Sequence, residues 1–214
     1  MKQTALYFFF LFILISCVSK KRVVTGLPEL AKPGQGGYVK GELIFPLNNK
    51  PTPQCHASTI AETPSGLVVA FFAGSYEKNP DVGIRVSRLE VGKWTTPVEV
   101  VNGVQNDALR YPCWNPVLFQ PKNAPIILFY KVGPDPRTWW GMMMTSNDNG
   151  KTWGPPSRLG EDDKIGHLLG PVKQTYSVSR RYHYMPSSTE AKIGDDTRWT
   201  AHYELTKDQV KPGK

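Results

Sequence analysis

The stretch that decides the fold is Ser146-Asn147-Asp148-Asn149-Gly150-Lys151-Thr152-Trp153. In this Ser-x-Asp-x-Gly-x-Thr-Trp pattern, the side chains of Ser146 and Asp148 can bond the nearby backbone, and Gly150 can adopt a positive φ at no steric cost. Trp153 adds a large ring that can bury against a sheet and hold the turn in place. We therefore predict a turn between β-strands in which Ser146, Asp148, Gly150, Thr152 and Trp153 have structural roles.

Short apolar runs bounded by Gly, Pro, Asn and Ser lie on both sides of this turn. No long segment shows the 3.6-residue apolar period of an amphipathic helix. The runs come in three sets of three: 58–62, 67–73 and 83–89; then 116–120, 125–132 and 140–146; then 171–175, 181–186 and 199–206. The sequence therefore predicts an all-β chain.

The three sets form an internal repeat. Ser87, Ser146 and Thr206 occupy corresponding positions in the third run of each set, at intervals of 59 and 60 residues. The stretch that begins at Ser87 keeps the Ser, the Gly-Lys and the Trp of the turn but lacks its Asp. Small sheets repeated at a fixed period are typical of β-propeller blades, which bury their faces against one another. Because closed propellers have at least about four blades, we expect a partial propeller of about three blades and a chain that is a fragment.

The first residues are predicted to be an export signal. Lys2 precedes an apolar run that is too short to span a bilayer, and Leu14-Ile15-Ser16-Cys17 follows in the manner of a bacterial lipobox. We expect a lipoprotein signal peptide at 1–16, lipidation of Cys17, a tether at 17–40 and the propeller domain at 41–214. The alternatives are an ordinary secretory signal or an uncleaved anchor. The predicted location is on a membrane, facing the periplasm or the cell surface.

Charge and cysteine usage limit the partners. The net charge of +8 favours anionic glycans or lipid head groups, or reflects surplus surface lysine. No basic block interleaved with aromatic residues is present, which argues against nucleic acid. The four His lack the spacing of a zinc site, so neither a metal nor another cofactor is predicted. Cys55 and Cys113 could pair in an export compartment, and the sequence leaves that pairing open.

Strand direction alternates within each set, so the loops opposite the Ser146 turn gather on one rim. Loops on a rigid scaffold usually carry function. The useful side chains there belong to His56, Glu77, Asp81, Trp114, Lys131, Asp135, Arg137, Trp139, His167, Glu190, Asp195 and Asp196.

Two of these residues are catalytic candidates. Asp81 precedes a strand, where its carboxylate could point into a central funnel as a general acid or base. The alternative is a cap on the turn after Pro80. His56 is a candidate base, or a packed and hydrogen-bonded histidine.

The substrate-binding candidates lie in the same loops. Arg137 and Lys131 flank a rigid Gly-Pro-Asp-Pro loop and could present cations to a substrate carboxylate, or be solvated loop charges. Trp139 could stack on a sugar ring. The remaining candidates for the substrate site are Trp114, His167 and Glu190.

The turn at Ser146 resembles the Asp-box of the sialidase-like, or BNR repeat, β-propellers. Further stretches are similar to a bacterial subgroup of predicted neuraminidases in that superfamily: 55–59, 80–84, 113–119, 129–134, 136–141 and 186–190. The resemblance implies a six-bladed propeller in which three arginines hold the sialic-acid carboxylate, a tyrosine assisted by a glutamate attacks, and an aspartate protonates the leaving group. Asp81 lies where that aspartate is expected. The tyrosine and most of the arginines of the family belong to later blades, and the stretch Leu43-Ile44-Phe45-Pro46 has no arginine.

The function expected from this resemblance is that of an exo-sialidase-like glycoside hydrolase, or part of one, acting on terminal acidic sugars of glycans. Two alternatives stay open. One is a polysaccharide lyase on the same fold, with His56 as base and Arg137 neutralising a uronate. The other is a glycan-binding lipoprotein without catalysis. The expected partners are a sialylated or uronate-containing glycan and, through the N-terminal lipid, a membrane.

Overall fold

The structure is a computed structural model that describes residues 34, 36, 41–160, 169–172, 175–177 and 182–207. The chain divides into two compact units, Met1–Glu42 and Leu43–Lys214. All the strands given below belong to the second unit. The predicted signal peptide, Cys17 and His167 lie outside the described residues.

The described residues form fourteen β-strands and no helix, so none of them lies in a helix that could cross a membrane. The all-β prediction is confirmed. The strands are β1 (Gln54–Thr63), β2 (Gly66–Gly74), β3 (Gly83–Glu90), β4 (Lys93–Trp94), β5 (Val98–Val101), β6 (Val104–Asn106), β7 (Leu109–Arg110), β8 (Cys113–Phe119), β9 (Ile126–Val132), β10 (Trp140–Ser146), β11 (Ser157–Arg158), β12 (Tyr176–Ser177), β13 (Tyr182–Ile193) and β14 (Asp196–Lys207).

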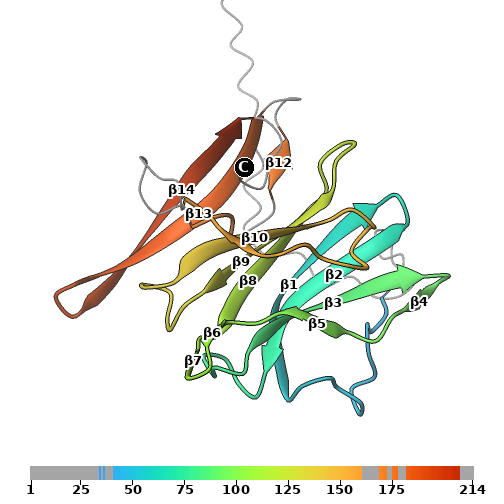
Figure 1. The fold of residues 1–214 in the computed structure, drawn as a ribbon, viewed down its shortest axis with the longest axis horizontal. Helices are drawn as coiled ribbons and strands as arrows, with labels where there is room; N and C mark the ends of the chain where they lie inside the picture. Colours follow the sequence, from blue (N-terminus) through green and yellow to red (C-terminus); the bar gives the residue numbers. More distant parts are fainter. Residues whose placement is uncertain are drawn as a thin grey trace, which may run out of the picture. The chain divides into compact units, whose positions relative to one another are not determined.

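Three antiparallel sheets follow one another along the chain (Figure 1). The first sheet has the order β1-β2-β3-β4, with β5 also paired to β3, and the second has the order β11-β10-β9-β8. The third sheet has the order β12-β13-β14, and β6 and β7 form a separate small hairpin. Each of the three predicted sets of runs thus contributes to one sheet.

The central strands are buried on both faces, which explains their nearly continuous apolar sequence. In β9, every residue from Ile126 to Val132 is buried, and in β2 burial runs from Val68 to Gly74. Alternate side chains of such a strand point to opposite faces, so each central strand supplies two cores. The first core lies between the first and second sheets, and the second lies between the second and third sheets.

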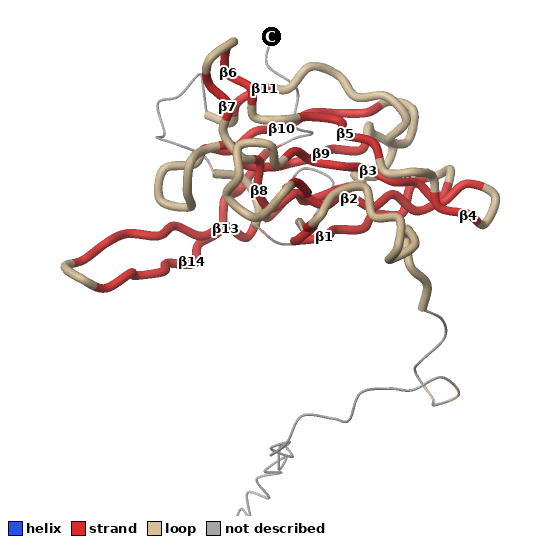
Figure 2. Tube along the Cα trace, turned by 90° about the horizontal axis from the view of Figure 1, so that it is seen from below, coloured by secondary structure: helices blue, strands red, loops and turns tan. Residues whose placement is uncertain are grey.

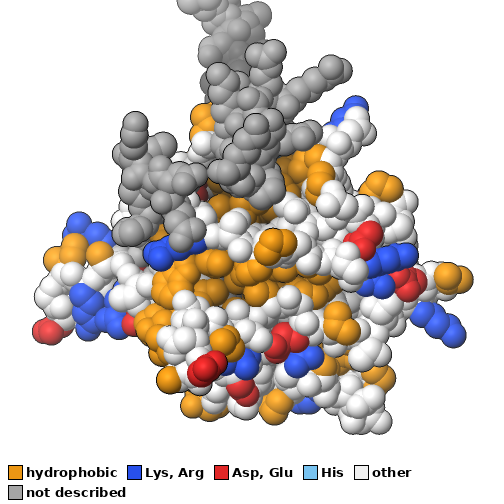
Figure 3. All heavy atoms as spheres, viewed as in Figure 1, with side chains coloured by type: hydrophobic (Ala, Val, Ile, Leu, Met, Phe, Trp, Pro, Cys, Tyr) orange, Lys and Arg blue, Asp and Glu red, His pale blue; other side chains and the backbone are white. Residues whose placement is uncertain are grey.

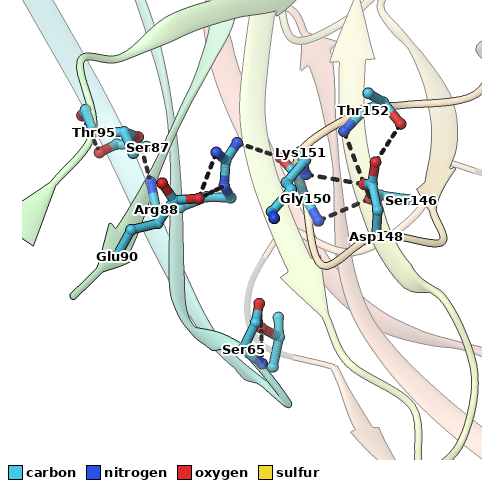
Figure 4. A network of polar contacts seen from close by, with 11 residues as sticks. Ser65, Ser87, Arg88, Glu90, Thr95, Ser146, Asp148, Gly150, Lys151 and Thr152 are labelled. Atoms are coloured by element: carbon cyan, nitrogen blue, oxygen red, sulfur yellow. Dashed lines mark hydrogen bonds and ion pairs between the residues drawn. The ribbon is translucent and has the colours of Figure 1, made fainter.

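The Ser146 turn forms as predicted (Figure 4). The Asp148 carboxylate accepts hydrogen bonds from the Thr152 hydroxyl at 2.5 Å, from the Thr152 N–H at 2.8 Å and from the Ser146 hydroxyl at 2.7 Å. Ser146 Oγ in turn accepts the Gly150 N–H at 2.8 Å, and Gly150 has a φ of 82°. The bonds from Thr152, then those from Ser146 and Lys151, hold the pKa of Asp148 well below its usual range. Trp153 packs against the first core.

The corresponding turn of the first sheet has a different geometry. Glu90 pairs with Lys93, so only Val91 and Gly92 form the loop, with φ values of 48° and 74°. Positive φ at both central residues is the requirement of a type I′ hairpin. Without the Asp, the repeat therefore closes as a tight hairpin, and Arg88 donates a hydrogen bond across to the Gly150 carbonyl at 3.3 Å (Figure 4).

The third repeat departs from the prediction. Residues 187–198 lie between the second and third runs of this set and were therefore expected to form a loop. They instead continue β13 and β14, whose pairing is uninterrupted from Tyr182 opposite Lys207 to Ile193 opposite Asp196. Alternating Thr, Ile and Trp favour this extension, and Gly194, with a φ of 64°, begins the two-residue loop. The run expected at 171–175 is also not a strand where it is described. Figures 1 and 2 show the resulting hairpin projecting beyond the other sheets.

Candidate functional site

A hollow of about 310 Å³ lies where the β9–β10 loop meets the third sheet. Its lining combines aromatic rings, cations and one carboxylate: Pro136, Arg137, Thr138, Trp139, Trp140, Arg158, Leu169, Thr189 and Glu190. Three of these, Arg137, Trp139 and Glu190, are sequence-predicted substrate-binding residues. The structure therefore brings the β9–β10 loop together with residues of β13 that lie more than fifty positions later in the chain.

Tight backbone packing fixes the wall of the hollow. Gly133 has a φ of 151°, and a Cβ atom at this position would lie 2.4 Å from the Cα atom of Trp139. Only glycine permits this approach of the loop to the end of β9. The loop itself is closed by the Asp135 carbonyl, which accepts the N–H groups of Thr138 and Trp139 at 3.1 and 3.0 Å. The Trp139 ring is thereby placed by backbone geometry.

Trp140 and Arg158 form a second part of the wall. The Arg158 guanidinium lies 5.0 Å from the centre of the Trp140 ring, within the range of a cation–π contact. The Tyr111 ring packs edge-on against the same indole at 5.8 Å between ring centres. Arg158 was missed by the sequence reasoning. Its position could have been inferred only from the short segment after Trp153. That segment contains β11, in which Arg158 pairs with Met142 of β10.

The cation of Arg137 is held at the mouth of the hollow. Its guanidinium bonds the Asp135 carboxylate through Nε at 3.1 Å and through Nη2 at 3.2 Å, and the side chain is about half exposed. The Asp135 carboxylate, and to a lesser degree Glu190, raises the pKa of Arg137. An exposed ion pair of this kind contributes little to stability, so the guanidinium can exchange partners with a ligand.

Lys131 lies beneath the hollow rather than in it. The residue is only 1% exposed, and its ammonium group donates hydrogen bonds to the carbonyls of Pro171 at 3.1 Å and Gly170 at 3.2 Å. It also lies 5.6 Å from the centre of the Trp139 ring. Burial lowers the pKa of Lys131 to about 7. This position does not fit the predicted role of Lys131 as a surface cation that binds a substrate. The ammonium group is instead buried beneath the hollow, where it contacts the Trp139 ring and the carbonyls of Gly170 and Pro171.

Asp81 caps a turn on the first sheet. Its carboxylate accepts the Ser75 hydroxyl at 2.5 Å and the Ser75 N–H at 3.1 Å. Its own N–H bonds the Asn79 side chain at 3.0 Å, and its carbonyl accepts Arg110 at 2.8 Å. The structure thus contains the turn cap that the sequence offered as the alternative. The side chain remains exposed, and its proposed catalytic role stays a prediction.

His56 and Trp114 occupy equivalent positions on β1 and β8. His56 is exposed and its ring stacks on Phe72 at 5.6 Å, whereas Trp114 is buried and its indole N–H donates to the Gly133 carbonyl at 2.8 Å. Each is followed by a residue with positive φ, Ala57 at 49° and Asn115 at 38°, where the strand register shifts. Trp114 is therefore a packing residue beneath Trp139, with 5.7 Å between ring centres.

The two catalytic candidates, Asp81 and His56, do not line the hollow. Cys55 is exposed, Cys113 is buried, and both are free, so the disulfide left open by the sequence is not formed; burial raises the pKa of the Cys113 thiol to about 12. Within the described ranges, no three His, Cys, Asp or Glu side chains are grouped to hold a metal ion.

Comparisons with known proteins agree with this architecture. A profile of the family described as BNR repeat-like domain matches residues 65–212. Among solved structures, a protein of unknown function from Dyadobacter fermentans DSM 18053 is similar, with a TM-score of 0.51 and 15% identity, over 71% of this chain and 51% of that one. At this identity the likeness concerns the fold alone, and the chain spans about half the length of that protein. No curated protein matches the chain.

Proposed function

The chain belongs to the BNR repeat-like family of the sialidase-like superfamily, and from this premise we propose that its three sheets are successive blades of a six-bladed sialidase-type β-propeller. Two features support the proposal. The sheets recur at intervals of 59 and 60 residues, and the central strands of the first two sheets each pack against the following sheet.

On this scaffold we propose the activity of an exo-sialidase-type glycoside hydrolase that acts on a terminal acidic sugar of a glycan. The observation that carries the proposal is the hollow, because two guanidinium groups and two indole rings converge on it. Arginine binds carboxylates with two parallel hydrogen bonds, and an indole face packs against the apolar face of a sugar ring. The volume of about 310 Å³ lies at the lower end of small-molecule sites, which suits one sugar ring.

The residues have separate roles in this proposal. Arg137 and Arg158 bind the carboxylate of the sugar, Trp139 and Trp140 hold its ring, and Glu190 accepts a hydroxyl. Asp81 lies in the β2–β3 loop and does not line the hollow, so this proposal requires a glycan that extends from the hollow to that loop. There the Asp81 carboxyl would protonate the leaving oxygen while water adds to the sugar carbon.

Binding is tested first, by titrating the full chain with N-acetylneuraminic acid and following tryptophan fluorescence and calorimetric heat. We expect saturable binding that Arg158→Ala weakens at least tenfold, because a charge-assisted pair contributes about 1.5–3 kcal/mol. Lys122→Ala is the matched control, since this exposed cation lies in the β8–β9 turn and outside the hollow. Equal weakening by both variants, or no binding by the unchanged chain, would refute the proposed site.

Turnover is tested with sialosides and with uronate polysaccharides. Release of free acidic sugar that Asp81→Asn abolishes supports the hydrolase. A product that absorbs in the ultraviolet, lost with His56→Ala, supports the lyase instead; exposure of the His56 ring is the observation that favours this second candidate. Binding without either product identifies a glycan-binding protein.

We also propose export and lipid anchoring, because Leu14-Ile15-Ser16-Cys17 matches a lipobox pattern. Metabolic labelling with a tagged fatty acid should mark the chain, and Cys17→Ser should remove the label. A labelled Cys17→Ser protein would show that the lipid is attached elsewhere.

A further inference from the structure

The second and third sheets differ at the rim that carries the hollow. In the second sheet, Val132 opposite Trp140 is the last pair before the β9–β10 loop. By the 60-residue interval of the repeat, Trp140 corresponds to Thr200, which pairs with Thr189. Four more pairs follow in the third sheet, and at about 3.3 Å per residue they raise the strands about 13 Å above that level. We call residues 190–199 the hairpin tip.

Packing does not account for the hairpin tip. From Ala191 onward both of its strands are exposed, and Ile193, on the side that faces the second sheet, is 50% exposed. Charged and apolar side chains mix on the projecting end (Figure 3, at the left). A two-stranded hairpin without a packed face is marginally stable, so its regular pairing above the rim indicates a role outside the core.

The base of the hairpin tip belongs to the hollow, because Thr189 and Glu190 line it. Alternate residues of a strand share a face. The face that buries Met185 against the second sheet therefore continues upward as Ala191, opposite Arg198. This face stands over the hollow. The opposite face, which a following blade of the proposed propeller would cover, is not involved.

The hairpin tip and the loop of Asp81 lie on opposite sides of the second sheet. That sheet packs against the first sheet in one core and against the third sheet in the other. A glycan that extends from the hollow to the β2–β3 loop, as the proposed function requires, thus leaves the hollow in the direction away from the hairpin tip.

We propose that the hairpin tip is a specificity-determining wall, which closes the hollow at the end away from Asp81 and admits only the terminal sugar of an acidic glycan. This inference rests on the proposed function, because it assumes an acidic sugar in the hollow. The hollow of about 310 Å³ suits one ring, and paired strands form a more precise barrier than a loop. A sugar with a further substituent on its far side meets the hairpin tip, and such a clash excludes competing ligands.

The first test compares two ligands of the full chain by calorimetry. One is sialyllactose, in which the sialic acid is terminal, and the other carries a glucose residue on the far end of the glycerol side chain of that sialic acid. We expect the unchanged chain to bind the substituted ligand at least about tenfold more weakly. Replacing residues 191–198 by Asn-Gly leaves Glu190 and Trp199, which pair, around a two-residue turn. This shortened chain should bind the two ligands within about twofold of each other.

Val91→Asn is the matched control, because it creates the same Asn-Gly turn in the β3–β4 hairpin, outside the hollow. It should leave the difference between the ligands unchanged. Equal binding by the unchanged chain, or a difference that survives in the shortened chain, would overturn the wall. Loss of both ligands from a folded shortened chain would also overturn it, because the hairpin tip would then hold the sugar. Failure of the unchanged chain to bind sialyllactose would instead refute the sugar site itself, and the wall with it.

A labelling measurement keeps the hairpin at full length. Ala191→Cys places a thiol on the face that stands over the hollow, and Lys192→Cys places one on the opposite face. Sialyllactose with a bromoacetyl group on the glycerol side chain should alkylate Ala191→Cys beyond the level of the unchanged chain, which already contains Cys17, Cys55 and Cys113. The same group on the lactose end should not. Equal labelling of Lys192→Cys, labelling from the lactose end, or none at all would overturn the proposal.

Discussion

The two interfaces between successive sheets hold the molecule together by different means. Between the first and second sheets, Phe72, Ile84, Leu118 and Leu128 are buried in a core whose side chains are mostly apolar. Between the second and third sheets, Met185 packs on Phe119 and Phe129, and next to them Lys131, Ser187 and Glu204 are also buried. An apolar contact stabilises in proportion to its area, whereas a buried polar contact stabilises only while every partner is in place. The hollow lies beside the polar interface.

The polar interface is organised around the backbone groups of Leu169 and Gly170. Gly170 offers its carbonyl to Lys131 at 3.2 Å and to the Ser187 hydroxyl at 2.8 Å. Its N–H donates to one Glu204 oxygen at 3.0 Å, and the N–H of Leu169 donates to the other at 3.0 Å. Because Leu169 also lines the hollow, the same bonds that attach the third sheet define one wall of the candidate site. Polar contacts here position a site, and apolar contacts in the first interface supply stability.

The largest expected effect is a truncation in the apolar interface. Leu128→Ala should lower the free energy of unfolding by about 3–4 kcal/mol, because it removes a fully buried side chain and leaves a cavity. Met185→Ala in the second interface should cost less, about 2 kcal/mol, since Met185 has fewer buried apolar partners. Urea unfolding curves of both variants provide the comparison. Equal losses would mean that the two interfaces contribute alike.

An intermediate effect is expected from the polar interface. Glu204→Ala leaves the N–H groups of Leu169 and Gly170 without their acceptors, at a cost of about 1–3 kcal/mol. The loss should be local, so hydrogen exchange should accelerate at Leu169 and Gly170 and stay slow in β2 and β9. Glu204→Gln, which keeps one acceptor oxygen, should retain part of the protection. Uniformly faster exchange across all sheets would show that the third sheet does not open separately.

The same contrast explains how far the sequence predicted the structure. The long strands of the first two sheets were predictable, because central strands such as β2 and β9 are buried on both faces and therefore have continuous apolar sequences. The third sheet was predicted poorly, since the residues of its long hairpin are mostly exposed and polar positions interrupt the apolar pattern.

The candidate site was predicted only in part for a related reason. Arg137 and Trp139 belong to one loop and were found together, whereas Arg158 reaches the hollow through a two-residue strand with no pattern of its own. Lys131 was interpreted as an exposed loop cation. Its burial depends on carbonyl groups at Gly170 and Pro171, about forty residues away, and a local pattern does not specify such partners.

The smallest expected effect concerns the protonation of Lys131. Burial lowers its pKa from 10.5 to about 7, so between these values the unfolded chain binds a proton that the folded chain has released. Stability therefore rises with pH through this window, by about 1 kcal/mol between pH 7 and pH 8, and levels off above the unfolded pKa.

The variant Lys131→Met tests this dependence, because it keeps the apolar stem and removes the titrating group. As the pH rises, the unfolding free energy of the unchanged chain should increase relative to that of Lys131→Met. Lys122→Met, at an exposed position, should show no such trend. A constant difference for Lys131→Met would mean that Lys131 keeps its proton in the folded chain, as a stable ion pair with Glu204 would require, and that the second interface is held by charge rather than by neutral hydrogen bonds.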